Sequence, residues 1–148
     1  MNIPMKIKKL HPNAILPAYA SVGAAGADLH ALCNEGSVTV EAGKTVLVHT
    51  GVAMAIPEGY VGLVYARSGM ASKRGLAPAN KVGVVDCDYR GEVMVALHNH
   101  SGAEEVVSKG ERIAQMVIAP YLKAEFSVVD ELSDTVRGEG GFGSTGTK

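Results

Sequence analysis

Residues 83–92 combine, within one glycine-bracketed turn, the residue types from which a ligand-binding site can be built. The turn carries two carboxylates, Asp86 and Asp88, and then Tyr89 and Arg90. Apolar runs precede and follow it, so we expect these groups on a hairpin that presents them to a ligand. The alternative is a solvated polar turn, because aspartate and glycine favour turns for purely local reasons.

The C-terminal strip, residues 137–146, contains the parts of a phosphate-binding segment. Its glycines let the backbone approach a ligand closely. Arg137 supplies a positively charged guanidinium that can bind phosphate through two N–H groups, and Ser144 and Thr145 supply hydroxyl donors. Phe142 adds a large apolar ring that suits a flat base. A disordered, solvating tail is the alternative. We expect a segment that is mobile when empty and closes as a lid over a ligand.

Three further segments carry groups that could meet an anion or a metal ion. At residues 66–71 a strand ends and a short helix begins, so Arg67 and Ser68 would add charge and a hydroxyl at the helix N-terminus. A capped helix with a solvent-exposed arginine is the alternative. Asp28 lies in a small-residue loop and could meet a hydrated magnesium ion or form an Asx turn. Gln115 interrupts an apolar strand, where its amide needs a partner.

The elements that must position these groups are mainly strands, because apolar residues recur with a period of two and helical periodicity is nearly absent. The alternating positions are Val38 and Val40; Val46 and Val48; Val52, Met54 and Ile56; and Val93, Val95 and Leu97. Turn signals separate them as in an antiparallel sandwich or barrel, so we expect an all-β fold. The runs 82–85 and 93–97 are the expected strands of the hairpin. Only residues 68–74 resemble a helix, with Ser68 as N-cap and Gly75 as its stop.

Length and charge narrow the class of protein. The chain has 148 residues, 47% of them hydrophobic, which suits one compact domain. Fourteen basic and fifteen acidic side chains give a net charge of −1, so no broad basic face is expected for nucleic acid or for an anionic membrane. We expect the β-barrel to span residues 1–136 and a flexible arm of the same domain to span residues 137–148.

The two cysteines and the lengths of the apolar runs favour an intracellular location. Cys33 and Cys87 are too few for a disulfide framework and lack the spacing of a zinc site, which fits a reducing compartment. No charged-then-apolar leader is seen, and no apolar run approaches the roughly 18 residues of a membrane span. We therefore expect a soluble, cytoplasmic protein.

Taken in order, five segments resemble the motifs of the homotrimeric deoxyuridine triphosphate nucleotidohydrolases, the dUTPases. These segments are residues 25–29, 66–71, 83–92, 110–118 and 137–146. Each is a weak signal alone, but five in order are very specific, and the match spans the whole chain. Two departures are small: Ala27 stands where an aromatic or leucine is common, and Ala66 often corresponds to proline. Neither departure removes a chemical group.

The resemblance implies a distorted jelly-roll β-barrel with one short helix and a glycine-rich C-terminal arm, assembled as a homotrimer. Each active site would be built from three chains, which contribute the first, second and fourth motifs, the third motif, and the fifth motif, respectively. The implied reaction is hydrolysis of dUTP to dUMP and pyrophosphate with Mg²⁺ as cofactor. The reaction would limit uracil incorporation into DNA and supply dUMP for dTMP synthesis.

The resemblance also implies roles for individual residues. Asp86 would activate the water that attacks the α-phosphorus, a role that suits a carboxylate ionised near neutrality. Tyr89 would lie under the deoxyribose and exclude a 2′-hydroxyl by clash. Residues implied in uracil and sugar binding are Asn80, Gly83, Val85, Asp86, Tyr89 and Phe142. Residues implied in phosphate binding are Arg67, Ser68, Gly69, Gln115, Arg137, Ser144 and Thr145. Asp28 would reach Mg²⁺ through metal-bound water, with the ion held mainly by the substrate phosphates.

The sequence is also compatible with three other functions. A deoxycytidine triphosphate deaminase shares the implied fold, but it would use a glutamate beside the base where this turn offers Tyr89. A dUTPase-like module that binds nucleotide without turnover would owe its biology to protein partners. A purely structural jelly-roll trimer would have no need of Phe142 in a glycine strip.

Overall fold

The computed structural model describes residues 3–142, which form an all-β molecule with one short helix. In chain order the elements are β1 (Lys6–Lys9), β2 (Ala18–Tyr19), β3 (Ala27–His30), β4 (Ser37–Val40), β5 (Thr45–Val48), β6 (Val52–Ala55), β7 (Tyr60–Tyr65), α1 (Ser68–Arg74), β8 (Leu76–Pro78), β9 (Gly83–Val85), β10 (Val95–Asn99), β11 (Glu105–Ser108) and β12 (Arg112–Pro120). The expected all-β fold is confirmed.

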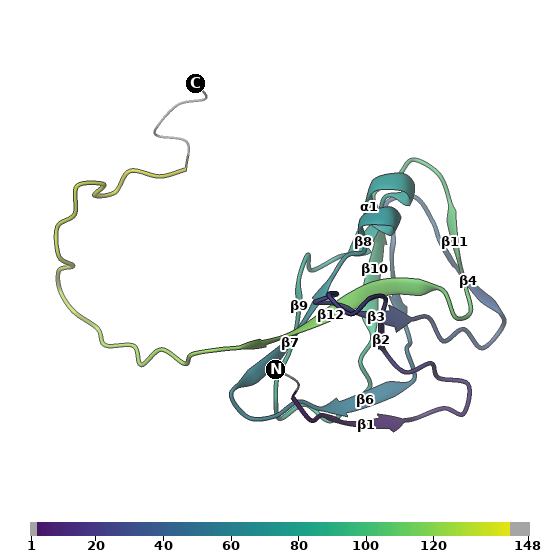
Figure 1. The fold of residues 1–148 in the computed structure, drawn as a ribbon. Helices are drawn as coiled ribbons and strands as arrows, with labels where there is room; N and C mark the ends of the chain where they lie inside the picture. The colour runs from purple at the N-terminus through teal and green to yellow at the C-terminus, as the bar shows by residue number, and fades with distance from the viewer. Residues whose placement is uncertain (1–2, 143–148) are drawn as a thin grey trace.

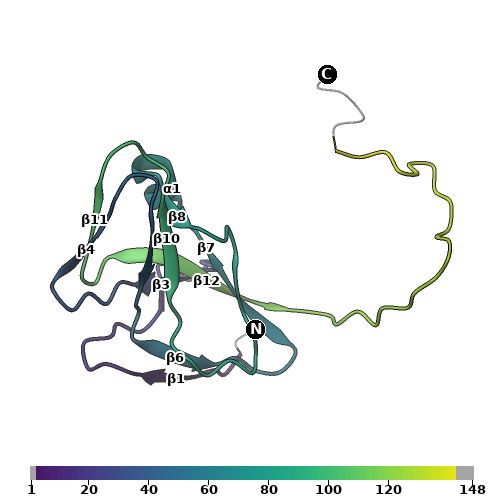
Figure 2. The same ribbon diagram turned by 180° about the vertical axis from the view of Figure 1, so that it is seen from behind.

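The strands form four antiparallel sheets that wrap around one core (Figure 1). The largest sheet has the strand order β2-β3-β12-β7-β9, so β12, which comes late in the sequence, lies between two earlier strands. A sheet with the order β5-β10-β8 and the pairs β1-β6 and β11-β4 complete the body. The reverse view in Figure 2 shows β1 beside β6 and β11 beside β4. Segments far apart in the sequence therefore meet at every sheet.

The core follows from the alternation of apolar residues along the strands. Leu29 of β3, Leu97 of β10 and Ile113 of β12 are each 0% exposed and belong to one hydrophobic cluster. Burying a side chain of this size contributes about 1.5–3 kcal/mol relative to leaving it exposed. The cluster holds the sheets against one another and leaves the polar residues of the motifs on the loops and outer faces.

The helix begins and ends as predicted, but its cap differs from the prediction. Arg67, not Ser68, occupies the N-cap position, with φ −86° and ψ 135°, and no side chain caps the helix there. Ser68 is the first helical residue, and its carbonyl accepts a hydrogen bond from the Ser72 hydroxyl at 2.6 Å. The predicted stop is confirmed, because Gly75 adopts the left-handed conformation with φ 66° and its N–H caps the last turn.

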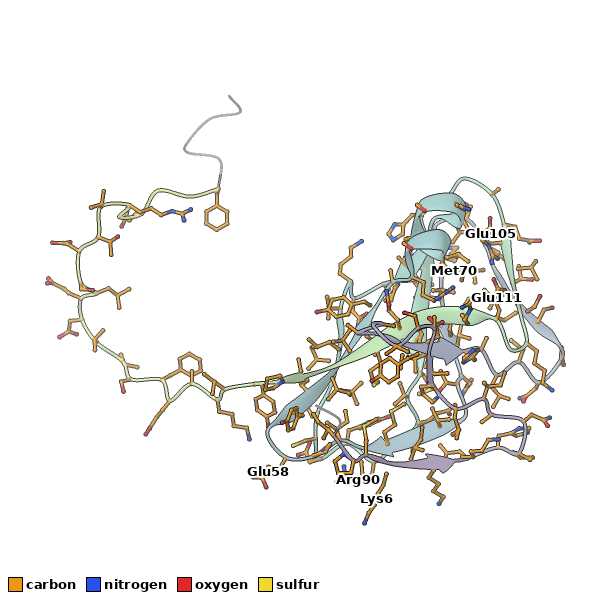
Figure 3. All side chains as sticks on the ribbon, viewed as in Figure 1. Lys6, Glu58, Met70, Arg90, Glu105 and Glu111 are labelled. Carbon is orange, nitrogen blue, oxygen red and sulfur yellow. The ribbon has the colours of Figure 1, made fainter. Side chains whose placement is uncertain are left out.

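Arg74 ties α1 to the segments that precede β12. Its Nε donates to Glu105 at 2.6 Å, its Nη1 donates to Glu111, and its Nη2 donates to the carbonyl of Val106 at 2.6 Å. Figure 3 shows Glu105 and Glu111 beside Met70 of α1. These bonds fix the helix, and with it the segment 66–71, relative to the start of β12.

The expected hairpin across the acidic turn is wrong. β9 pairs with β7, whereas β10 pairs with β5 and β8, so the two strands that flank the turn belong to different sheets. Nine residues, 86–94, separate these strands, more than the about two to five residues of a common hairpin loop. The acidic segment is therefore a loop that crosses between sheets.

Beyond β12 the chain leaves the body. Figures 1 and 2 both show residues 121–142 running away from the sheets. The segment carries large apolar side chains that are almost fully exposed, namely Leu122, Phe126, Val128, Leu132, Val136 and Phe142. The boundary expected at residues 136 and 137 stays a prediction. Within the part of the chain that the structure describes, no helix is long and apolar enough to cross a membrane.

We predict that Asn99→Ala destabilises the fold strongly. Asn99 is 0% exposed, and its amide donates to the carbonyls of Val40 at 2.8 Å and Ala103 at 2.7 Å. Its Oδ1 accepts from the N–H and the hydroxyl of Ser101. Truncation removes the donor to the buried Val40 carbonyl and three part-buried hydrogen bonds, so the free energy of unfolding should fall by about 2–4 kcal/mol in urea titration. Asn34→Ala, at an exposed position, is the matched control, and an equal loss in both variants would contradict the prediction.

Candidate active site

The acidic loop forms one wall of a cavity of about 320 Å³. As the sequence predicts, the cavity is lined by Asn80, Gly83, Val85, Asp86 and Tyr89. Val85 is the last residue of β9 and Asp86 follows it, so the strand pairing with β7 sets the position of the carboxylate. Asp86 is exposed and lies at the cavity wall, where its carboxylate can meet a ligand or water.

The loop is held by its own side chains rather than by a strand ladder. The Tyr89 N–H donates to the Asp86 carbonyl at 3.2 Å. The Arg90 guanidinium folds back on the loop, with Nη1 donating to the carbonyls of Cys87 at 2.7 Å and Tyr89 at 2.9 Å. Figure 3 labels Arg90 at the edge of the body. Arg90 therefore acts within the loop and not as a cavity-lining charge.

Glu92 anchors the end of the loop to the turn before β6. One carboxylate oxygen accepts from the N–H groups of Thr50 at 3.2 Å and Gly51 at 2.7 Å, and the other lies 2.9 Å from Nδ1 of His49. Burial alone raises the pKa of Glu92, but the hydrogen bonds from His49 and from these two amides outweigh it and lower the pKa. The Tyr89 hydroxyl donates to the Glu92 carbonyl at 2.9 Å, so the anchor also holds the ring.

A second cavity, of about 350 Å³, gathers the first, second and fourth motifs. Asp28, Arg67, Ser68 and Gln115 line it, as the sequence predicts. The register of β12 places Gln115 opposite Asp28 of β3 and opposite Tyr65 of β7. Gly69 lies next to Ser68 in α1 and is exposed. Strand pairing therefore brings these four residues together from distant parts of the chain.

Asp28 organises the charges of the second cavity. It is 7% exposed, and its Oδ1 accepts from Arg67 Nε at 2.8 Å while its Oδ2 accepts from Arg112 Nη1 at 3.2 Å. Pairing a buried carboxylate with two guanidinium groups offsets the cost of removing it from water. The Gln115 side chain donates to the Ala66 carbonyl at 2.9 Å and so steadies the backbone just before Arg67. Arg67 Nη1 also donates to the Arg112 carbonyl at 3.5 Å, so Nη2 is the part of the guanidinium best placed to meet an anion.

One chain does not bring the two cavities together. They share no lining residue within residues 3–142. Val64 lines the first cavity and its neighbour Tyr65 lines the second. Successive residues of a strand point to opposite faces, so the two cavities lie on opposite sides of β7. Asp86 lines the first cavity and a further one beside Val61 and Leu63, whereas Arg67 lines the second.

The arm is remote from both cavities. Arg137 Nε donates to the nearby Gly140 carbonyl at 2.8 Å, and the Phe142 side chain is fully exposed. Ser144 and Thr145 lie outside the described residues. The predicted lid residues are thus not in contact with the site of their own chain where the structure describes them.

Sequence reasoning missed several residues of the site. Glu92 and Arg112 lie inside recognised motifs, so their charges were a usable signal. Leu47, Met94 and Ala96 line the first cavity but lie on or beside strands. No pattern distinguishes such apolar positions from core positions in the sequence.

Comparison with known proteins adds the decisive observation. The family model named dUTPase matches residues 12–146 of the chain. The chain belongs to the dUTPase family. Two relatives, each named deoxyuridine 5'-triphosphate nucleotidohydrolase, come from Syntrophotalea carbinolica and Desulfitobacterium hafniense. The first is 51% identical over 144 residues, covering 97% of each chain, and the second is 53% identical over 132 residues, covering 88% of this chain and 87% of the relative.

Solved dUTPase structures agree with the fold. A mutant dUTPase of Staphylococcus bacteriophage 80alpha with dUpNHpp gives a TM-score of 0.88 at 31% identity, covering 98% of this chain and 99% of that chain. A mutant dUTPase from phage phi11 of S. aureus, solved with a structural Mg(II) ion, gives a TM-score of 0.77 at 26% identity, covering 87% of this chain and 98% of that chain.

These likenesses confirm the expected dUTPase jelly roll and the expected reaction. The chain is a hydrolase that converts dUTP to dUMP and pyrophosphate. The relatives are nucleotidohydrolases rather than deaminases, so the deaminase alternative is set aside.

We predict that Glu92→Gln weakens the fold in a pH-dependent way. The pKa of Glu92 is lower in the folded state than its ordinary value of 4.5. Ionised Glu92 therefore stabilises the fold fully above about this pH, and the stabilisation is lost as the pH falls through the folded-state pKa. Urea unfolding at neutral pH should show the wild type more stable by about 1 kcal/mol.

The difference between wild type and Glu92→Gln should narrow as the unfolding measurements move below pH 4.5. Glu41→Gln, which neutralises an exposed carboxylate, is the control for the loss of one negative charge. A difference that stays constant from neutral to strongly acid solution would contradict the assigned role of Glu92.

Proposed function

We propose that this dUTPase hydrolyses its substrate in a site that is shared between three copies of the chain, with Asp86 as the base. The position of the two cavities on opposite sides of β7 supports this proposal most directly. Asp86 and Arg67 of one chain line separate cavities, so in this proposal Asp86 acts on a phosphate that is bound by Arg67 of another chain. The segment of residues 121–142, which runs away from the sheets, would carry the arm to a third chain.

The proposed chemistry is an attack of water on the α-phosphorus. Asp86 accepts a proton from the water as its oxygen bonds to phosphorus, and the bond from the α-phosphorus to the bridging oxygen breaks. Pyrophosphate leaves and dUMP remains. The exposed carboxylate at the cavity wall supports this role, since a general base must reach its water directly.

Phosphate binding is assigned to the second cavity and the arm. Arg67, held by Asp28 through Nε and by the Arg112 carbonyl through Nη1, would present Nη2 to the triphosphate. Ser68 and Gln115 line the same cavity, and Gly69 follows Ser68 in α1. Arg137, Ser144 and Thr145 of another chain would close over the phosphates, and Phe142 would cover the uracil. The full exposure of Phe142 in a single chain supports a partner elsewhere.

A magnesium ion fits this donor set only through the substrate. Among the described residues no cluster of three or more histidine, cysteine or acidic side chains could hold a metal ion. Both oxygens of Asp28 already accept from arginines, which suits contact through water rather than direct ligation. When bound to the triphosphate oxygens, Mg²⁺ would neutralise charge that develops on the leaving pyrophosphate.

The first cavity is proposed to select the base and the sugar. The backbone at Gly83 and Val85 would pair with the uracil edge, with Asn80 beside it. Tyr89 would lie under the deoxyribose, where its ring occupies the space that a 2′-hydroxyl needs. The cavity volume of about 320 Å³ is at the lower end of the range for small-molecule sites.

We predict that Asp86→Asn lowers kcat for dUTP by about 10²–10⁴-fold, the range expected for loss of a general base. The amide keeps the size of the side chain but cannot accept the proton, so folding and affinity for dUpNHpp should be retained. Steady-state turnover and calorimetric titration measure the two effects. Asp88→Asn, two residues away in the same loop, is the matched control. Normal turnover by Asp86→Asn would remove Asp86 as the base.

We predict that two inactive chains restore activity when they are combined. One is Asp86→Asn, and the other is truncated after Val136. If Asp86 and the arm reach a site from different chains, random mixed trimers at equal amounts contain about one quarter intact sites. Co-refolding followed by a dUTP assay measures the recovery. A truncated Asp86→Asn double variant replaces the truncated chain in the control. No recovery with the two single variants would contradict sharing between chains.

A further inference from the structure

The position of the Tyr89 ring is set from two directions by residues 91 and 92. Its hydroxyl donates to the Glu92 carbonyl at 2.9 Å, and Glu92 is in turn anchored to the N–H groups of Thr50 and Gly51. Tyr89 is 42% exposed, so the protein covers only part of the residue. The contacts that remain therefore decide where the ring lies.

Gly91 supplies the space that the ring occupies. A Cβ on Gly91 would lie 2.4 Å from the Tyr89 hydroxyl oxygen, 2.6 Å from Cζ and 3.0 Å from Cε2. These three nearest atoms all belong to Tyr89. The φ of Gly91 lies outside the left-handed region, so its backbone conformation does not itself require glycine. The Tyr89 ring, rather than the backbone, requires that residue 91 has no side chain.

We propose that Gly91 is a positioning residue that sets the sugar selectivity of the enzyme through Tyr89. A methyl group at position 91 would push the ring off the Glu92 carbonyl and out of its place in the first cavity. The inference rests on the proposed contact between Tyr89 and the deoxyribose. A displaced ring no longer fills the space of a 2′-hydroxyl, so the cost of binding UTP falls relative to that of dUTP.

The test is the ratio of kcat/KM for dUTP to kcat/KM for UTP in the Gly91→Ala variant. We expect this ratio to fall by about tenfold or more, because a shift of about 1 Å in a positioning group can change rates by that amount. A purely structural role would lower both activities together and leave the ratio unchanged. Gly102→Ala adds the same methyl group where nothing lies within 4 Å, and it should keep the wild-type ratio.

A double-mutant cycle separates this inference from the role of Tyr89. Tyr89→Ala alone should lower the selectivity ratio, and adding Gly91→Ala to it should change the ratio no further, because the methyl group has lost its ring to displace. Lower selectivity in Tyr89→Ala with an unchanged ratio in Gly91→Ala would overturn the inference and keep the proposed role of Tyr89. An unchanged ratio in Tyr89→Ala would overturn both.

A second variant covers the case in which Gly91→Ala does not fold. Tyr89→Phe removes the hydrogen bond to the Glu92 carbonyl without adding bulk, so it loosens the ring from the other side. We then expect the selectivity ratio to fall by a few-fold, with the thermal midpoint of unfolding near that of the wild type. In that case, an unchanged ratio in Tyr89→Phe would overturn the proposal.

Discussion

The antiparallel pairing of β12 with both β3 and β7 is the interaction on which the rest of the structure depends. It places Gln115 opposite Asp28 and Tyr65, and it turns the neighbouring Met116, which is 2% exposed, into the core. A slip of one residue would exchange these faces, exposing the core and burying the polar groups. The same register therefore specifies the hydrophobic core and the second cavity, and neither can change without the other.

The acidic loop follows a different rule, because it crosses between sheets and has little ladder pairing to hold it. Side chains take over that task. Arg90 bonds to carbonyls of its own loop, and Glu92 bonds to the turn before β6. Asp86 therefore has its position set by the end of β9 on one side and by polar contacts within the loop on the other, and its carboxylate stays exposed. A loop built in this way combines a defined position with direct access to water.

Period-two alternation was sufficient to predict the all-β class, and Gly75 was sufficient to predict the end of α1. The hairpin was predicted wrongly because local pattern identifies a strand but not its partner, and β9 finds β7 rather than β10. The prediction that Ser68 is the N-cap was wrong for a similar reason, because a preferred residue type does not fix where the first helical turn starts. Asp28 was predicted as a site residue, but its pairing with Arg112 depends on a register between residues 84 positions apart. Contacts of that kind have no local signal.

The segment that follows β12, residues 121–142, connects the fold to the proposed assembly. Apolar side chains such as Leu122 and Phe126 are 98% and 93% exposed on a single chain. Covering each would contribute about 1.5–3 kcal/mol, which favours a surface on another copy. The glycines at 138, 140 and 141 act in the opposite sense, because ordering them costs more backbone entropy than ordering other residues. In the proposed assembly, apolar anchoring near β12 and an entropic cost at the far end would together give a lid that stays attached to its neighbour but closes only when phosphates offset that cost. Such a lid would reopen once pyrophosphate has left, and the site could then accept the next substrate.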